Sequence, residues 1–253
     1  MPLNQTKKRP HIKGVLFDLD GTLYHQIPLR AIMTIFLVLL NIYNPKELFR
    51  KAKVITGYRN AQEKLRYLCQ GVSDCSIRQI DLTIHNTGES RDYVSETIIE
   101  WFEERPLPFL HFCQRRGLNF VLDFFHQNGF KLGVFSDYPP DEKLQALKVY
   151  KYFSTVVSVN DPEVKGFKPK TNGFTVAARR MGLQPSEILY VGDRAEVDGD
   201  GASEAGMLAV ILKGLFDRKK SCDYLVLGSL YDLLKVINQP LTRSRETFGL
   251  ITS

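Results

Sequence analysis

The stretch HIKGVLFDLDGTLY, from His11 to Tyr24, decides how this chain folds. Its apolar residues 15–17 predict the end of a buried strand, and the Gly-Thr pair that follows breaks that strand. Asp18 and Asp20 therefore fall where strand becomes turn, and their carboxylates project to the same side. Open α/β sheets bind ligands just past the carboxyl ends of their strands. Because paired acids repel each other, the pattern calls for a divalent metal or a carboxylate acid/base pair.

Composition describes a globular protein with a large core. The chain has 253 residues, of which 43% are hydrophobic and 25% charged, so disorder is excluded and one large domain or a domain with a substantial insertion is expected. The formal charge of +6 suits an anionic substrate. The basic residues are spread along the chain except for a cluster at residues 7–13, so we expect no nucleic-acid partner.

The cysteines indicate the compartment. Cys69, Cys75, Cys113 and Cys222 show no CxxC spacing and no matching histidine pairs, so neither a zinc site nor a disulfide framework is expected. A reducing compartment fits this pattern. No apolar run precedes the first strand, which argues against a secretory signal. We therefore expect a cytoplasmic protein.

The pattern after Tyr24 is helical as far as about Cys113, and then α/β alternation begins. Helices are expected over residues 45–70 and 89–105. Further strands are expected at 131–137, 155–159, 187–193, 207–212 and 223–227, with helices starting near 118, 141, 173 and 229 and a loose tail from 238. This alternation predicts a doubly wound, parallel, Rossmann-like sheet. We predict a discontinuous α/β core, residues 1–24 and 114–253, with an all-helical cap domain inserted at 25–113.

The segment from Ile27 to Tyr43 is almost continuously apolar, with Arg30, Thr34 and Asn41 as its clearly polar members. It is shorter than the roughly 20 residues that span a bilayer. A helix that is apolar on all sides is usually buried. We expect a buried cap helix or a dimer face in preference to a membrane contact, which leaves monomer and homodimer both open.

The motif of Asp18, Asp20, Gly21 and Thr22 after a hydrophobic strand resembles the DxDGT signature of the haloacid dehalogenase superfamily of phosphohydrolases. The resemblance implies that Ser136, at the end of GVFSD, presents its hydroxyl to phosphoryl oxygens together with a neighbouring backbone N–H. We take Asp137 as part of that phosphate site. Thr22 is expected to fix the turn and orient Asp20.

Two downstream motifs continue the resemblance. In KGFKPKTNGF, Lys165, Lys168 and Lys170 compete, and the family pattern of a lysine before proline selects Lys168, whose cation would offset crowded negative charge. In YVGDRAEVDGDGASEAGM, Asp193 and Asp198 resemble the family's GDxxxxD form. Asp200 departs from the usual apolar or small residue and receives no role.

The resemblance also implies the cofactor. Carboxylates of Asp18 and Asp193, with the backbone carbonyl of Asp20, would hold Mg²⁺, although Mn²⁺ would fit the same oxygens. Asp198 would act behind these ligands or through water.

The implied reaction is phosphoryl transfer, with Asp18 as the nucleophile that becomes an aspartyl phosphate and Asp20 as the general acid and base. Family members that remove halides lack an aspartate at the position of Asp20, so its presence favours phosphate monoesters. The first hypothesis is a Mg²⁺-dependent phosphatase for a small phosphorylated metabolite. A sugar phosphomutase, a phosphatase for a lipid-linked phosphate at a membrane surface, and a non-catalytic phosphate-binding scaffold are the alternatives. The position and helical character of the cap resemble those of phosphoglycolate phosphatase and β-phosphoglucomutase relatives.

Overall fold

The structure is a computed structural model that describes residues 11–68, 74–214 and 224–238. Its centre is one six-stranded sheet with the order β3-β2-β1-β4-β5-β6, in which every neighbouring pair is parallel. The strands are β1 (Gly14–Phe17), β2 (Lys131–Ser136), β3 (Thr155–Ser158), β4 (Ile188–Gly192), β5 (Leu208–Leu212) and β6 (Leu225–Leu227). The predicted parallel α/β fold and its six strands are confirmed.

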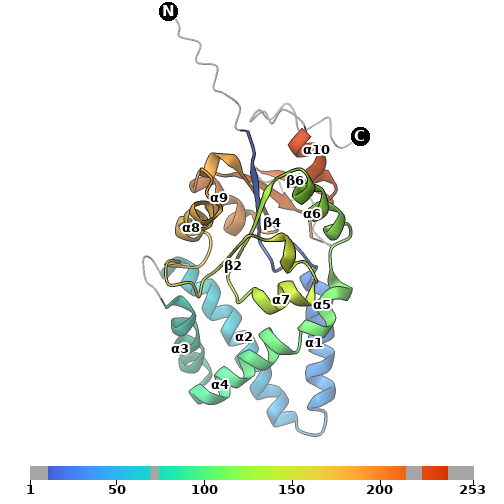
Figure 1. The fold of residues 1–253 in the computed structure, drawn as a ribbon. Coiled ribbons are helices and arrows are strands. Elements are labelled where there is room, and N and C mark those ends of the chain that lie inside the picture. The colour runs from blue at the N-terminus through green and yellow to red at the C-terminus, as the bar shows by residue number, and fades with distance from the viewer. Residues whose placement is uncertain (1–10, 69–73, 215–223, 239–253) are drawn as a thin grey trace, which may run out of the picture.

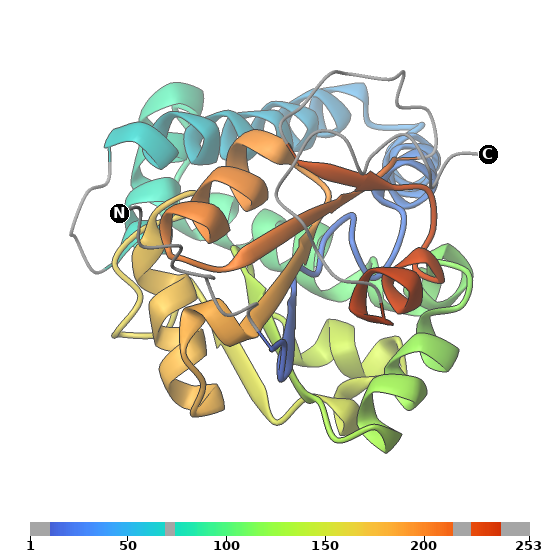
Figure 2. The same cartoon turned by 90° about the horizontal axis from the view of Figure 1, so that it is seen from above.

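Helices cover both faces of this sheet, as Figure 2 shows. The side chains of β1 alternate, so Val15 and Phe17 enter the core on one face and Leu16 enters the core on the other. The first face packs against α6 (Leu118–Gln127), α7 (Asp141–Ala146) and α10 (Asp232–Asn238). The second packs against α8 (Thr171–Met181) and α9 (Asp200–Glu204). Burial on both faces explains why the strands read as continuous apolar runs.

The described part of the segment between β1 and α6 consists of helices joined by turns. It contains α1 (Gln26–Leu40), α2 (Pro45–Leu68), α3 (Cys75–Thr87), α4 (Arg91–Ile98), a π-helical turn (Ile99–Glu104) and α5 (Leu107–Cys113). These helices lie beyond the carboxyl edge of the sheet, in the lower half of Figure 1. We call residues 25–113 the helical insertion. It has a hydrophobic cluster of its own around Val54, Tyr58, Val94 and Ile98.

Both ends of the helical insertion also pack on the α/β part. Leu29 from α1 and Leu110 from α5 belong to the same apolar cluster as Phe17. The sequence does not predict α5, because Pro106 and Pro108 disfavour the interior of a helix. Pro106 instead sits just before the first turn, where a missing N–H costs nothing.

Helix α1 is buried on one side only, so it is not the fully buried cap helix that was one expectation, and the alternative of a dimer face stays a prediction. Leu29, Met33 and Leu37 are buried at four-residue spacing, whereas Ile35 and Leu39 on the opposite side are 57% and 60% exposed. The i, i+4 geometry of a helix places only one stripe of side chains against the molecule. Among the described residues, no helix is long and apolar enough to cross a membrane.

Several sequence expectations concern cysteines and chain ends. Cys75 and Cys113 are buried, whereas Cys69 and Cys222 lie outside the described residues. The basic leader up to residue 10 and the tail from residue 239 also lie outside them. The helix expected to start near residue 141 begins at Asp141, with Pro140 at its N-cap position.

The contact between α8 and β2 yields a stability prediction. A Cβ at Gly173 would lie 2.1 Å from Cζ of Phe135, in a fully buried part of the core. Although alanine favours helices, we expect Gly173→Ala to destabilise the fold by about 1–3 kcal/mol through overpacking. Urea unfolding measures the change. Thr175→Ala, at an exposed position of the same helix, is the control, and equal stability of the two variants would contradict this packing.

Candidate active site

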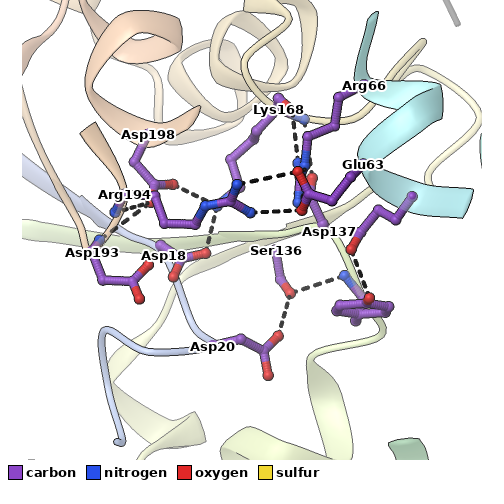
Figure 3. Close-up of polar contacts among 12 residues, drawn as sticks. Asp18, Asp20, Glu63, Arg66, Ser136, Asp137, Lys168, Asp193, Arg194 and Asp198 are labelled. Atoms are coloured by element: carbon purple, nitrogen blue, oxygen red, sulfur yellow. Dashed lines mark hydrogen bonds and ion pairs between the residues drawn. The ribbon is translucent and has the colours of Figure 1, made fainter. Parts of the chain in front are cut away.

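The polar residues singled out from the sequence meet at the carboxyl edge of the sheet. Asp18 follows β1, Ser136 ends β2, and Asp193 follows β4, so three adjacent strands deliver them to one place (Figure 3). The amide of Asp18 donates to the carbonyl of Val191 at 2.8 Å, which fixes the first of these loops against β4. A cavity of about 560 Å³ opens here, between the sheet and the helical insertion.

Asp18 and Lys168 form a buried ion pair. Nζ of Lys168 contacts Oδ1 of Asp18 and donates to Oδ1 of Asp198 at 2.8 Å and to Oη of Tyr190 at 3.1 Å. Burial opposes the charge of Lys168, but the carboxylates of Asp18 and Asp198 outweigh it and hold its pKa well above the usual value. Of the three lysines in its segment, the structure brings Lys168 to the site, whereas Lys165 is exposed.

The second oxygen of Asp18 is free to bind a ligand. Oδ2 of Asp18 is buried and has no hydrogen-bond partner among the described residues. Asp18, Asp193 and Asp198 each offer one oxygen within 4.8 Å of the others. Both oxygens of Asp198 are already occupied, because Oδ1 accepts from Lys168 and Oδ2 from the amides of Asp193 and Arg194 at 3.2 and 3.1 Å. Among these three aspartates, the oxygens still available to a ligand therefore belong chiefly to Asp18 and Asp193.

The electrostatics of this corner favour a cation. Burial and then the charge of Asp198 raise the pKa of Asp193 to about 7. Burial also raises the pKa of Asp18 well above its usual range, and the charge of Lys168 offsets this only in part. A divalent cation between the two carboxylates would stabilise their charged forms. This aspartate cluster is thus able to bind a metal ion, although the carbonyl of Asp20, an expected ligand, accepts a hydrogen bond from Gln26 at 2.5 Å.

Gly21 makes room for Asp193. Its φ of +106° lies in a region that residues with a side chain rarely adopt, and a Cβ there would lie 2.0 Å from Oδ2 of Asp193. The absence of a side chain at Gly21 thus allows Asp193 to approach the turn after β1.

Asp20 is held by three side chains. Its Oδ1 accepts from Oη of Tyr24 and from Nζ of Lys143, the latter at 2.8 Å, and its Oδ2 lies 3.5 Å from Oγ of Ser136. Burial raises the pKa of Asp20, but the ammonium of Lys143 and these hydrogen bonds outweigh burial and lower it. Lys143 lies on α7 outside every motif, so nothing in the sequence pointed to it. Tyr24, at the end of the opening stretch, was also not assigned.

The structure gives Thr22 a different contact from the expected one. Its hydroxyl is fully buried and has no hydrogen-bond partner among the described residues. Its amide donates to the carbonyl of Leu19 at 3.2 Å, so Thr22 takes part in the turn. The side chain of Asp20 is oriented instead by the three partners described above.

Asp137 and Arg66 connect the core to the helical insertion (Figure 3). Oδ1 of Asp137 accepts from the amide of Lys168 at 3.1 Å, and Oδ2 pairs with Nη1 of Arg66 from α2. The same Nη1 donates to the carbonyl of Lys168 at 2.7 Å. Glu63 of α2 accepts from Nε of Arg66 and pairs with Arg194, which follows β4. Sequence reasoning missed Arg66, because it lies far from every motif.

Together, these contacts place the ammonium of Lys168 beside Asp18, whose Oδ2 has no partner among the described residues. The carboxylate of Asp20 lies next to Ser136. Such a set suits attack by Asp18 on an electrophile that carries negative charge, with Asp20 placed to transfer protons.

The Arg66 contact predicts a large effect on stability. Arg66→Ala would leave the carboxylate of Asp137 buried without its partner, so we expect it to lower the free energy of unfolding by about 3–5 kcal/mol. Arg194→Ala removes an exposed ion pair and should cost less than about 1 kcal/mol. Urea unfolding of both variants checks this, and comparable losses would refute the contrast.

The cluster of Asp18, Asp193 and Asp198 predicts that a divalent cation stabilises the fold. A ligand that binds only the folded state at about 100 times its dissociation constant adds about 2.7 kcal/mol. We therefore expect Mg²⁺ or Mn²⁺ to raise the melting temperature of the wild type and to have little effect on Asp193→Asn. Asp92→Asn, an exposed position on α4, is the control and should respond like the wild type. An equal response of both variants would place the cation elsewhere.

Comparisons with known proteins agree with this geometry. The chain is 30% identical over 243 residues to a glyceraldehyde 3-phosphate phosphatase of Methanocaldococcus jannaschii, covering 89% of this chain and 97% of that protein. It is 27% identical over 256 residues to a phosphoglycolate phosphatase of Shigella flexneri, covering 93% of this chain and 96% of that one. The fold is similar to the crystal structure of a HAD phosphatase from Thermococcus onnurineus, with a TM-score of 0.63 and 23% identity over 91% of this chain and all of that one.

The sequence also matches the family described as haloacid dehalogenase-like hydrolase over residues 12–206. This range begins at the strand before Asp18 and ends after Asp198, so it includes every residue of the site built above. The chain therefore belongs to the haloacid dehalogenase-like hydrolases.

Proposed function

We propose that this enzyme is a Mg²⁺-dependent phosphatase that hydrolyses a phosphate monoester of a small metabolite through an aspartyl phosphate. The observation that carries the proposal is the state of Asp18, whose Oδ1 contacts Lys168 while its buried Oδ2 has no hydrogen-bond partner in the part of the chain that the structure describes. The relatives named above are phosphatases, which supports the same reaction class.

Asp18 acts first in the proposed reaction. Its carboxylate attacks phosphorus, a bond from Asp18 to phosphorus forms, and the bond from phosphorus to the alcohol oxygen breaks. Asp20 gives its proton to that departing oxygen. In the second half, Asp20 takes a proton from water, the hydroxide attacks phosphorus, and inorganic phosphate leaves as the carboxylate of Asp18 is restored.

The side chains around Asp20 fit both of its tasks. In the ligand-free protein, Lys143 and Tyr24 lower the pKa of Asp20 against the effect of burial and favour the carboxylate, the form that accepts a proton from water. A phosphate dianion beside it would raise that pKa and favour the protonated form required for the first half. Ser136, 3.5 Å from Asp20, is placed to donate its hydroxyl to a phosphoryl oxygen.

Asp18 and Asp193 would hold the metal, with Asp198 positioned behind them through Lys168 and the two amides. When bound, the cation supplies positive charge that shields the approach of an anionic nucleophile to an anionic phosphate. Lys168 contributes the same sign of charge at Oδ1 of Asp18. We also propose that the helical insertion acts as a cap, because α1 and α2 line the cavity in which the ester would lie.

The proposal predicts specific losses of activity. With Mg²⁺ and a panel of phosphate esters, the wild type should release inorganic phosphate, and Asp18→Asn or EDTA should abolish release. Asp20→Asn should slow it by about 10²–10⁴-fold, the usual contribution of general acid–base catalysis. Asp92→Asn should retain activity.

Other results would decide against this function. Isomerisation of a sugar phosphate without phosphate release would indicate a phosphomutase. Turnover confined to phosphorylated lipids in vesicles would place the enzyme at a membrane surface. A folded wild type that turns over no ester, or an Asp18→Asn variant that keeps its activity, would contradict the proposed mechanism.

A further inference from the structure

More basic side chains line the cavity than form ion pairs with its carboxylates. Lys168, Lys143, Arg66 and Arg194 each form an ion pair with a carboxylate at the site. Arg115 donates to backbone carbonyls, including that of Gly21 at 2.8 Å. Two further arginines, Arg30 of α1 and Arg59 of α2, line the same cavity. Within the described residues, neither of these two contacts a carboxylate.

Arg30 is linked to the site through one side chain. Its Nη2 donates to Oε1 of Gln26, and Nε2 of Gln26 donates to the backbone carbonyl of Asp20. Asp20 is the residue proposed to protonate the departing alcohol. Arg30 therefore lines the cavity and is connected through Gln26 to the residue that the proposal places beside the leaving group.

Arg59 lines the same cavity from the other helix, α2. Its guanidinium carbon lies 5.2 Å from the centre of the Phe102 ring, and that ring lies 6.0 Å from the ring of Tyr138. The amide of Tyr138 donates to Oγ of Ser136 at 3.1 Å. One aromatic wall thus connects Arg59 to the proposed phosphate site.

The two guanidinium groups interact with each other as like charges. Burial and then the charge of Arg30 lower the pKa of Arg59. Both residues are solvent-exposed within the cavity wall, so a ligand can reach them. An anion near both would relieve their repulsion, and the forked N–H groups of arginine match the oxygens of a carboxylate or phosphate.

We infer that Arg30 and Arg59 form a second anion subsite, so that the substrate is a small phosphate monoester whose alcohol part carries another anionic group. This inference rests on the proposed function for the position of the ester phosphate. The reacting phosphate lies at Asp18, and the second anion, a carboxylate or another phosphate, lies between α1 and α2. A substrate with an uncharged alcohol part leaves this subsite empty.

Binding of non-hydrolysable probes tests the subsite without relying on turnover. Calorimetry with Mg²⁺ compares 3-phosphonopropionate and ethane-bisphosphonate, which carry a second anion, with propylphosphonate, which ends in a methyl group. We expect the wild type to bind at least one of the two probes that carry a second anionic group about tenfold or more tightly than propylphosphonate. A charge-assisted hydrogen bond contributes a binding free energy of this size. Whichever anionic probe binds more tightly identifies the second group as a carboxylate or a phosphate.

The double variant Arg30→Gln/Arg59→Gln should lose this preference. Arg78→Gln/Arg116→Gln removes the same charge at exposed positions outside the cavity and should keep it. Equal affinity of the wild type for all three probes, or equal loss of preference in both double variants, would overturn the inference.

Hydrolysis separates this inference from the proposed function. The ratio of kcat/KM for 2-phosphoglycolate or a bisphosphate to that for ethyl phosphate should fall about tenfold or more in Arg30→Gln/Arg59→Gln. If the wild type hydrolyses esters without preferring a second anion, the subsite is refuted and the phosphatase stands. If it binds the probes with a second anionic group selectively but hydrolyses nothing, the phosphatase is refuted and the subsite stands.

Discussion

The buried ammonium of Lys168 is the interaction on which the site depends. It contacts the carboxylates of Asp18 and Asp198 in a buried position, and a buried charge is tolerated only when it is paired and hydrogen-bonded. The pair occupies one oxygen of Asp18, and the other oxygen has no hydrogen-bond partner within the described part of the chain. The charge of Lys168 offsets in part the effect of burial on the pKa of Asp18, and Oδ2 of Asp18 stays available to a ligand.

The same cluster ties the two parts of the chain together. Arg66, from the helical insertion, binds both Asp137 and the carbonyl of Lys168, so α2 is attached directly to the loop that carries the lysine. Glu63 extends this contact to Arg194 beyond β4. Any change in the position of α2 must therefore break a buried charged contact at the site. This arrangement places the chemistry on the strand ends and gives α1 and α2 the remaining walls of the cavity.

Asp20 illustrates how environment divides the work between two nearby carboxylates. Asp18 lies against other acids, and burial raises its pKa, whereas Lys143 and Tyr24 lower the pKa of Asp20 against the same effect. The pKa values of Asp18 and Asp20 are thus shifted in opposite directions before any ligand binds. A cation would bring Asp18 back to its charged form, and a phosphate would move Asp20 toward its protonated form.

The sequence by itself determined the parallel sheet, because strands buried on both faces must be apolar throughout and the helices between them show their own periodicity. Asp18 and Asp20 stood out because they follow an apolar strand, whereas Ser136, Lys168 and Asp193 were identified through the resemblance of their motifs to those of the haloacid dehalogenase family. The sequence did not indicate Lys143, Arg66, Arg30 or Arg59, since a lone basic residue on a helix looks the same whether it faces solvent or a cavity. Only the tertiary structure decided those positions, and it also showed that one side of α1 stays exposed, because packing selects a single stripe of an apolar helix.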